Sequence, residues 1–126
     1  MNLNQLNGNN LAYIGDAYYE LRVRKHLIEK GITKNKELRK ISIAYVSAKA
    51  HQTIYYAICD CFLENEHQIF LRGRNNAPHG YRKNVDKTAY QISTGLEAVI
   101  GYLYLSENYE RLDALIDMIF KEVEKK

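Results

Sequence analysis

The sequence contains little proline and little cysteine. One proline in 126 residues, together with few alternating runs of β-branched residues, argues against a β-rich fold and favours an all-helical chain. Cys59 and Cys61 are only two positions apart, a spacing that fits neither a structural zinc pair nor a thioredoxin-type motif. The four histidines are scattered without metal-ligand spacing. We therefore expect the cysteines to be free thiols.

The chain also has no basic-then-apolar leader. Its most apolar segment, residues 89–105, carries too many polar and tyrosine side chains for a good membrane span. A length of 126 residues is ordinary for one domain and is sufficient for a real core. We expect a single domain over residues 1–126, with no membrane association and a cytoplasmic location.

Asp16 is isolated in its part of the sequence. It is the only ionisable side chain other than tyrosine in the first nineteen residues. A helical stripe of apolar residues predicts the core-facing side of this segment: Leu11, Ile14, Tyr18 and Leu21. The helical neighbours of Asp16 on the other side are also mostly apolar: Ala12, Tyr19 and Val23. The helix is thus apolar almost all round, which predicts a central element with Asp16 facing a second, partly enclosed surface.

Glu97 is isolated in the same way, since it is the only charged residue between positions 89 and 105. A helical stripe there predicts burial of Ile92, Leu96, Val99 and Leu103, and Glu97 lies off that stripe. A carboxylate in an apolar setting must be protonated, paired or bound to a cation, because an isolated buried charge costs several kcal/mol or more.

Two such carboxylates suggest a shared divalent metal. Small residues beside both acids would let the two helices approach closely: Gly15, Ala17, Gly95, Ala98 and Gly101. We therefore expect a Mg²⁺ or Mn²⁺ site held by Asp16, Glu97 and water. The alternative is structural, with Asp16 exposed to solvent or Glu97 satisfied by hydrogen bonds from tyrosine hydroxyls.

Basic residues are concentrated in residues 72–87. This segment contains five basic residues and one acidic residue, so its local charge is +4. The net charge of the whole chain is +3, which leaves −1 for all other residues. Two glycines, three asparagines and the only proline predict a long loop here. The interpretation is contact with the phosphates of a polyanion such as RNA, and the alternative is a solvated loop without function. The candidate RNA-binding residues are Arg72, Arg74, Asn75, His79, Arg82, Lys83 and Lys87.

The remaining patterns predict the order of the helices. The first is capped by Asn9 or Asn10 and ends near Lys30, with Gly31 just beyond it. The others begin near Thr33 or Asn35, after Ser47, near Glu64, near Lys87 and near Asn108, and the fourth ends near Arg72 and Gly73. Leu112, Leu115, Ile116 and Ile119 are predicted to face inward in the last helix.

Two short motifs resemble a known family. Residues 11–17, Leu-Ala-Tyr-Ile-Gly-Asp-Ala, resemble the signature of the ribonuclease III catalytic domain, and residues 96–101, Leu-Glu-Ala-Val-Ile-Gly, look like its second signature helix. In that family the Asp of the first motif and the Glu of the second bind the catalytic metal. The resemblance therefore assigns metal ligation and catalysis to Asp16 and Glu97.

The sequence departs from the family pattern at three acidic positions, which hold Asn9, Ala12 and Thr94. These departures, together with residues 45–50 and 72–75, look like the Mini-ribonuclease III branch, whose members consist of the catalytic domain alone. No double-stranded-RNA-binding domain is expected. With fewer acids, both one and two metal ions per site remain open.

The resemblance implies an all-helical, dimeric bundle like the ribonuclease III endonuclease domain. It implies a Mg²⁺-dependent bacterial endoribonuclease that cleaves double-stranded RNA, leaves 5′-phosphate ends and matures precursor 23S ribosomal RNA. The tyrosines of the first motif helix, Tyr13, Tyr18 and Tyr19, exceed what a small core needs and fit a symmetric homodimer. Two other interpretations are a non-catalytic RNA-binding module with the same fold and a helical protein-interaction domain.

Overall fold

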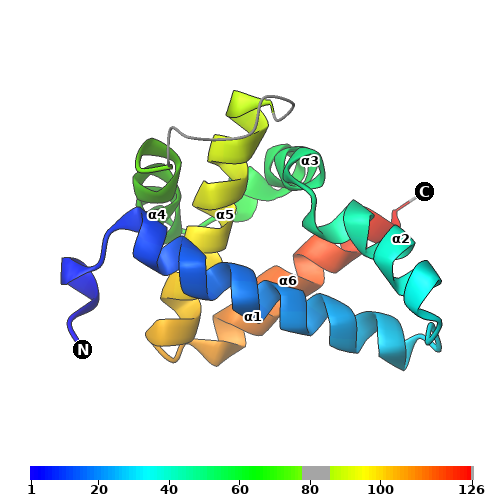
Figure 1. Cartoon of the computed structure of the whole chain (residues 1–126). Coiled ribbons are helices and arrows are strands. Elements are labelled where there is room, and N and C mark those ends of the chain that lie inside the picture. The colour runs from blue at the N-terminus through cyan, green and yellow to red at the C-terminus, as the bar shows by residue number, and fades with distance from the viewer. Residues whose placement is uncertain (78–85, 126) are drawn as a thin grey trace.

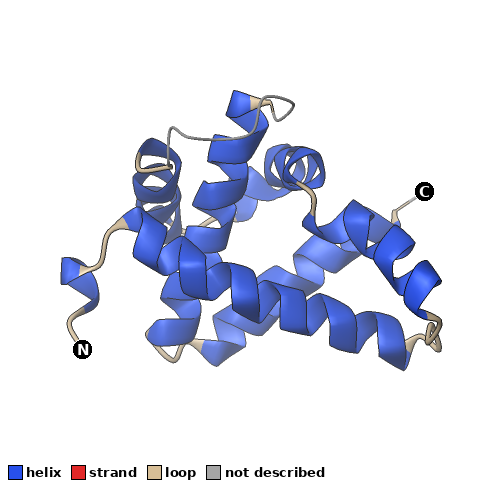
Figure 2. Ribbon diagram, in the orientation of Figure 1, coloured by secondary structure: helices blue, strands red, loops and turns tan. Residues whose placement is uncertain are grey.

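The structure is a computed structural model that describes residues 1–77 and 86–125, and all regular elements in these ranges are helical (Figure 2). The α-helices are α1 (Gly8–Glu29), α2 (Asn35–Val46), α3 (Ala48–Ile58), α4 (Glu64–Asn75), α5 (Lys87–Leu105) and α6 (Tyr109–Glu124). Short 3₁₀ helices span Leu3–Gln5 and Cys59–Cys61. The predicted all-α class is confirmed. No helix in the described ranges has the combination of length and hydropathy that a membrane crossing requires.

The ends of α1 are fixed by local hydrogen bonds. The Asn7 side chain accepts from the Asn10 backbone N–H at 2.8 Å, and the Asn10 side chain accepts from the Asn7 N–H at 3.1 Å. This reciprocal capping box makes Asn7 the N-cap, so the predicted cap at Asn9 or Asn10 is wrong by two or three residues. Gly31 has a φ of 91° just past the helix, as predicted for a C-terminal glycine.

Two further caps place α3 and α5. The Ser47 hydroxyl accepts from the Ala50 N–H at 3.0 Å, which confirms the predicted start of α3. The Asp86 carboxylate accepts from the N–H groups of Thr88 and Ala89 and caps α5. The only acidic residue in the basic stretch therefore has a structural role.

Helix α4 continues to Asn75, beyond the end that we predicted near Arg72 and Gly73. Gly73 is buried in the contact with α5, where a Cβ atom would lie 2.7 Å from the Ala98 Cβ and 2.9 Å from the Gly95 Cα. This glycine permits close helix packing and does not stop the helix.

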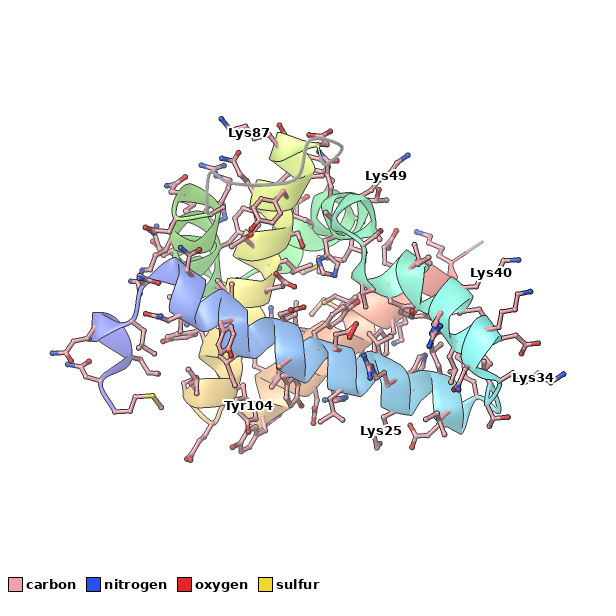
Figure 3. All side chains as sticks on the ribbon, viewed as in Figure 1. Lys25, Lys34, Lys40, Lys49, Lys87 and Tyr104 are labelled. Atoms are coloured by element: carbon pink, nitrogen blue, oxygen red, sulfur yellow. The ribbon has the colours of Figure 1, made fainter. Side chains whose placement is uncertain are left out.

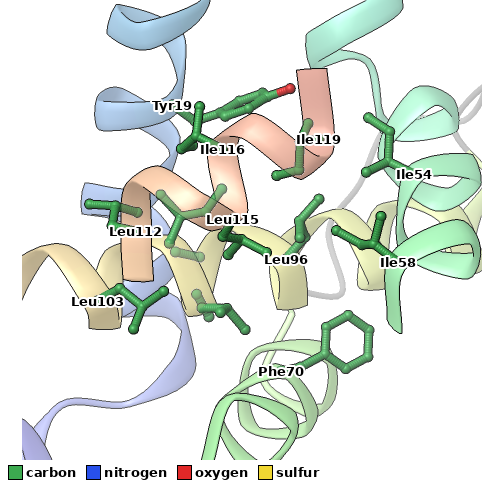
Figure 4. Close-up of a cluster of buried hydrophobic side chains, with 14 of the residues drawn as sticks. Tyr19, Ile54, Ile58, Phe70, Leu96, Leu103, Leu112, Leu115, Ile116 and Ile119 are labelled. Carbon is green, nitrogen blue, oxygen red and sulfur yellow. The ribbon is translucent and has the colours of Figure 1, made fainter. Parts of the chain in front are cut away.

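Helix α5 is the centre of the fold and packs against α1, α3, α4 and α6 (Figure 1). Its predicted core stripe is confirmed, since Ile92, Leu96, Val99 and Leu103 are all buried. The inward face of α6 is confirmed as well: Leu112, Leu115, Ile116 and Ile119 join Leu96, Leu103 and Phe70 in one cluster (Figure 4). Burial of these side chains provides the main driving force for folding.

The predicted core stripe of α1 is largely wrong. Leu11 is buried, but Ile14 and Tyr18 are half-buried and Leu21 is 61% exposed. The core-facing residues are Ala12, Tyr19, Val23 and Leu27 in addition to Leu11. The helix is apolar on several faces, and the sequence period alone did not identify the face that packs against α5 and α6.

Candidate active site at the crossing of α1 and α5

Asp16 and Glu97 lie where α1 crosses α5. Beside Asp16, Gly15 contacts the α5 backbone so closely that a Cβ atom there would overlap the Glu97 carbonyl oxygen and lie 2.7 Å from the Gly101 nitrogen. Gly101 faces the Leu11 carbonyl oxygen in the same way. The two helices thus touch backbone to backbone, which brings together two acids that are 81 positions apart in the sequence.

Of the five small residues expected at this crossing, only Gly15 and Gly101 lie in the contact. Gly95 contacts Phe70 of α4, and Ala98 contacts Gly73 of the same helix. Ala17 is exposed on the outer side of α1. The expectation that Ala17, Gly95 and Ala98 allow the close approach of α1 and α5 is therefore wrong, because each faces another direction.

The Asp16 carboxyl affects the protonation of Glu97. Asp16 is exposed, so the prediction that it faces a partly enclosed surface is wrong, and Glu97 is half-buried. Burial raises the pKa of Glu97 to about 9, and a hydrogen bond with the Asp16 carboxyl, the Asp16 charge and the Glu20 charge act in the same direction. Every named cause favours the neutral form, so Glu97 holds a proton at neutral pH when no cation is bound.

Glu20 is an acid of this region that we did not predict. It lies one helical turn after Asp16 on α1, and its charge contributes to the raised pKa of Glu97. Its carboxylate pairs with Arg24 at 3.2 Å. The four-residue spacing from Asp16 is the sequence signal that would have identified it.

A buried hydrogen-bond network behind the acids also escaped prediction. The Tyr45 carbonyl oxygen accepts from the Tyr19 hydroxyl at 2.6 Å and lies 3.0 Å from Nε2 of His51. Because a carbonyl only accepts, Nε2 carries the imidazole proton, and Nδ1 accepts from the Ser93 hydroxyl at 2.7 Å. The Tyr45 carbonyl thus joins α1, α2 and α3, and His51 extends the network to Ser93 in α5.

Burial lowers the pKa of His51 to about 4, although the Tyr45 carbonyl and the Asp16 charge oppose that shift. The imidazole is therefore neutral at physiological pH. His51 has no charge with which to neutralise Asp16 or Glu97, and its role in this arrangement is to support the helices that carry them.

The donor atoms at the crossing suit a hard divalent cation. Carboxylate oxygens are the ligands that Mg²⁺ prefers, and Mg²⁺ keeps several waters when protein ligands are few. Within residues 1–77 and 86–125, no group of three or more His, Cys, Asp or Glu side chains is arranged to hold a metal. Asp16 and Glu97 therefore fit a site in which water supplies most of the coordination.

The predicted RNA-binding residues fall into two groups. Arg72, Arg74 and Asn75 lie in the last turn of α4 and not in a loop as predicted, and Lys87 is the first residue of α5. The Arg74 Nε donates to the Asn75 side chain at 3.3 Å. His79, Arg82 and Lys83 lie outside the described residues.

The all-helical fold fits a ribonuclease III catalytic domain, and a family model of the ribonuclease III domain matches residues 9–108. The chain belongs to the ribonuclease III family. This family comprises endoribonucleases that act on double-stranded RNA.

Within the family, the chain is similar to proteins named Mini-ribonuclease 3, as the sequence motifs indicated. It is 42% identical over 126 residues to the protein of Streptococcus pneumoniae, with 98% of each chain covered. It is 41% identical to that of Staphylococcus aureus, with 96% of this chain and 92% of the relative covered. A crystal structure of a Fusobacterium nucleatum protein superimposes with a TM-score of 0.83 at 31% identity, covering 93% of both chains. The predicted branch is confirmed.

Proposed function

We propose that this protein is a Mg²⁺-dependent endoribonuclease that cleaves double-stranded RNA, with Asp16 and Glu97 as its metal ligands and catalytic residues. Mn²⁺ has the same ligand preference and is expected to substitute. The observation that carries the proposal is the backbone contact between Gly15 and the Glu97 carbonyl, which brings Asp16 and Glu97 together where α1 crosses α5. Family membership supports the enzyme class.

When bound, the metal supplies an activated water for in-line attack on phosphorus and neutralises charge on the phosphate. The protein contributes ligand geometry. The Gly15 contact fixes the separation of the two helices, and the network around Tyr45 restrains the neighbouring backbone. Asp16 is exposed, so its carboxylate is accessible to substrate, and Glu97 would hold the metal in its deprotonated form. The expected products carry 5′-phosphate ends.

Basic residues at the α4 end and the α5 start are proposed to hold the RNA backbone. Arg72, Arg74, Asn75 and Lys87 are the described members of this group, and His79, Arg82 and Lys83 are proposed from the sequence. Arginine grips phosphate oxygens with two parallel hydrogen bonds, and neutralised phosphates release counterions. Binding should therefore weaken steeply with salt.

We also propose that α1 forms the interface of a homodimer. Large apolar side chains are exposed along one face of this helix: Tyr13 at 84%, Leu21 at 61% and Ile28 at 55%. Of the three tyrosines that suggested a dimer, only Tyr13 is free for this purpose, because Tyr19 is in the core and Tyr18 packs on Tyr104 with ring centroids 5.0 Å apart. Sedimentation of the wild type and of Leu21→Lys tests the interface.

The proposed substrate is precursor 23S ribosomal RNA in the bacterial cytoplasm. The substrate follows from the resemblance of the sequence motifs to the Mini-ribonuclease III branch, and the bacterial sources of the relatives support the bacterial setting. The chain is proposed to work as one catalytic domain, and the Streptococcus pneumoniae relative matches it along almost its whole sequence.

Incubation of a labelled RNA duplex with the protein in Mg²⁺ and in EDTA tests the activity. Cuts that appear in Mg²⁺, disappear in EDTA and return with added Mg²⁺ are the expected result. A duplex that is bound but stays intact in Mg²⁺ and in Mn²⁺ would identify a non-catalytic RNA-binding module instead.

A further inference from the structure

Helix α2 and the start of α3 carry a second concentration of positive charge. Residues 34–49 contain five basic side chains, Lys34, Lys36, Arg39, Lys40 and Lys49, against the single acid Glu37. The local charge is +4, equal to that of residues 72–87. When both segments are subtracted from the net charge of +3, the remaining residues carry −5. We call these five side chains the α2 basic face.

The basic side chains lie opposite the buried side of α2. Leu38, Ile41 and Tyr45 pack toward the core, whereas Lys36, Arg39 and Lys40 are exposed and follow the spacing of one helical face. Lys40 and Lys49 line the same hollow between α2, α3 and the end of α6, where Glu122 is also a lining residue that forms no ion pair with them. In Figure 3, Lys34, Lys40 and Lys49 follow one edge of the molecule, and the same edge leads on to Lys87.

The α2 basic face has no acidic partners in the described structure. Arg22, Arg24, Lys25, Lys30 and Arg111 each pair with a carboxylate, but none of the five residues of the α2 basic face forms an ion pair within residues 1–77 and 86–125. Like charges on one face repel one another and give no stability to the fold. Such a surface is complementary to a polyanion.

The position of α2 relative to the acid pair determines which part of a bound polyanion the α2 basic face would contact. Helix α2 packs on the C-terminal half of α1 and lines a cleft with Val23, Leu27 and Ile28. At 1.5 Å per helical residue, Asp16 lies roughly 10 Å along the axis from Val23 and roughly 18 Å from Ile28. The α2 basic face is therefore displaced from the acid pair along α1.

We infer that the α2 basic face binds the phosphate backbone of an RNA duplex on the arm that extends beyond the cleavage position. This inference rests on the proposed function and adds a second contact region to the one at residues 72–87. Four of the five residues are lysines, which act on phosphates as point charges, so the contact should depend on backbone charge and not on base sequence.

The double variant Lys36→Gln/Lys40→Gln tests the inference by fluorescence anisotropy in EDTA, where the RNA stays intact. The matched control is Lys25→Gln/Lys121→Gln, which removes the same charge from a surface formed by α1 and α6. On a duplex of two or more helical turns, we expect the α2 variant to lower the salt slope by about two and to weaken binding several-fold. The control should match the wild type.

A duplex of one helical turn centred on the active site supplies the second measurement, and there the α2 variant should bind as the wild type does. Unchanged binding of the long duplex, or equal losses with α2 and control variants, would overturn the inference. An equal loss on the short duplex would overturn the remote position of the contact. If the wild type cuts RNA but the α2 variant binds normally, this inference fails and the proposed function stands. If the wild type binds no duplex, the inference and the proposed function both fail.

Discussion

Gly15 of α1 lies directly against the carbonyl oxygen of Glu97 in α5, and no side chain separates the two backbones. The residue after Gly15 is Asp16, so the same contact that joins the helices sets the distance between the two acids. Rigid elements that touch in this way hold ligands more accurately than loops do.

Replacement of Gly15 by alanine should lower the free energy of unfolding by about 3 kcal/mol, because the added methyl group meets backbone and not a side chain that can turn away. Gly31→Ala is the control, since its Cβ would meet nothing within 4 Å and only the positive φ is strained. That change should cost about 1 kcal/mol. Urea denaturation measures both, and equal losses would contradict the tight crossing.

Removal of either carboxylate should abolish cleavage while the protein stays folded. Asp16→Asn and Glu97→Gln keep the shape of each side chain but remove the charge that binds the metal, so we expect a rate loss of at least about a thousandfold. Asp117→Asn, on the exposed face of α6, is the matched control and should cleave normally. Single-turnover cleavage in Mg²⁺ and circular dichroism give the two readings. Full activity of either site variant would end the metal-ligand assignment.

The neutral, buried His51 should make stability depend on pH. Its folded pKa of about 4 lies below the unfolded value of 6.5, so the unfolded chain binds the proton more readily. Its contribution is fully present above pH 6.5 and is lost as pH falls toward 4, by about 3 kcal/mol in total. Urea denaturation across this range measures the loss. An imidazole that titrates near 6.5 in the NMR spectrum of the folded protein would disprove its burial as a neutral group.

Neutralisation of Arg72 and Arg74 should weaken binding to RNA duplexes of any base sequence. Two lost phosphate contacts should reduce the slope of log K against log salt by about two. Anisotropy titrations at several salt concentrations measure this slope for the variant Arg72→Gln/Arg74→Gln. The control is again Lys25→Gln/Lys121→Gln. A slope that stays at the wild-type value would move the phosphate contact to other basic residues.

Local signals in the sequence were sufficient for much of the fold. The cap at Ser47, the glycine after α1 and the core stripe of α5 depend on residues within one or two turns, and the structure confirms all three. The candidate site was identified for a related reason. A lone carboxylate in an apolar segment is a local anomaly, and the helix that carries Glu97 shows one as clearly as the helix that carries Asp16.

The remaining features depend on contacts between distant segments. The buried face of α1 could not be selected because several of its faces are apolar, and α4 passes Gly73 because that glycine packs on α5. The hydrogen bond between His51 and Ser93 joins residues 42 positions apart, and the neighbouring sequence of neither residue indicates it. The charge of α2 is visible in the sequence, but its exposure on one face becomes evident only once the core is known.

The proton on Glu97 has a consequence for the proposed metal binding. A cation that bound between the two acids would displace that proton, so uptake of Mg²⁺ would acidify an unbuffered solution and would be favoured by alkaline conditions. If the proposal holds, magnesium and hydrogen ions compete for one carboxyl group, and a higher pH has the same effect as a higher magnesium concentration.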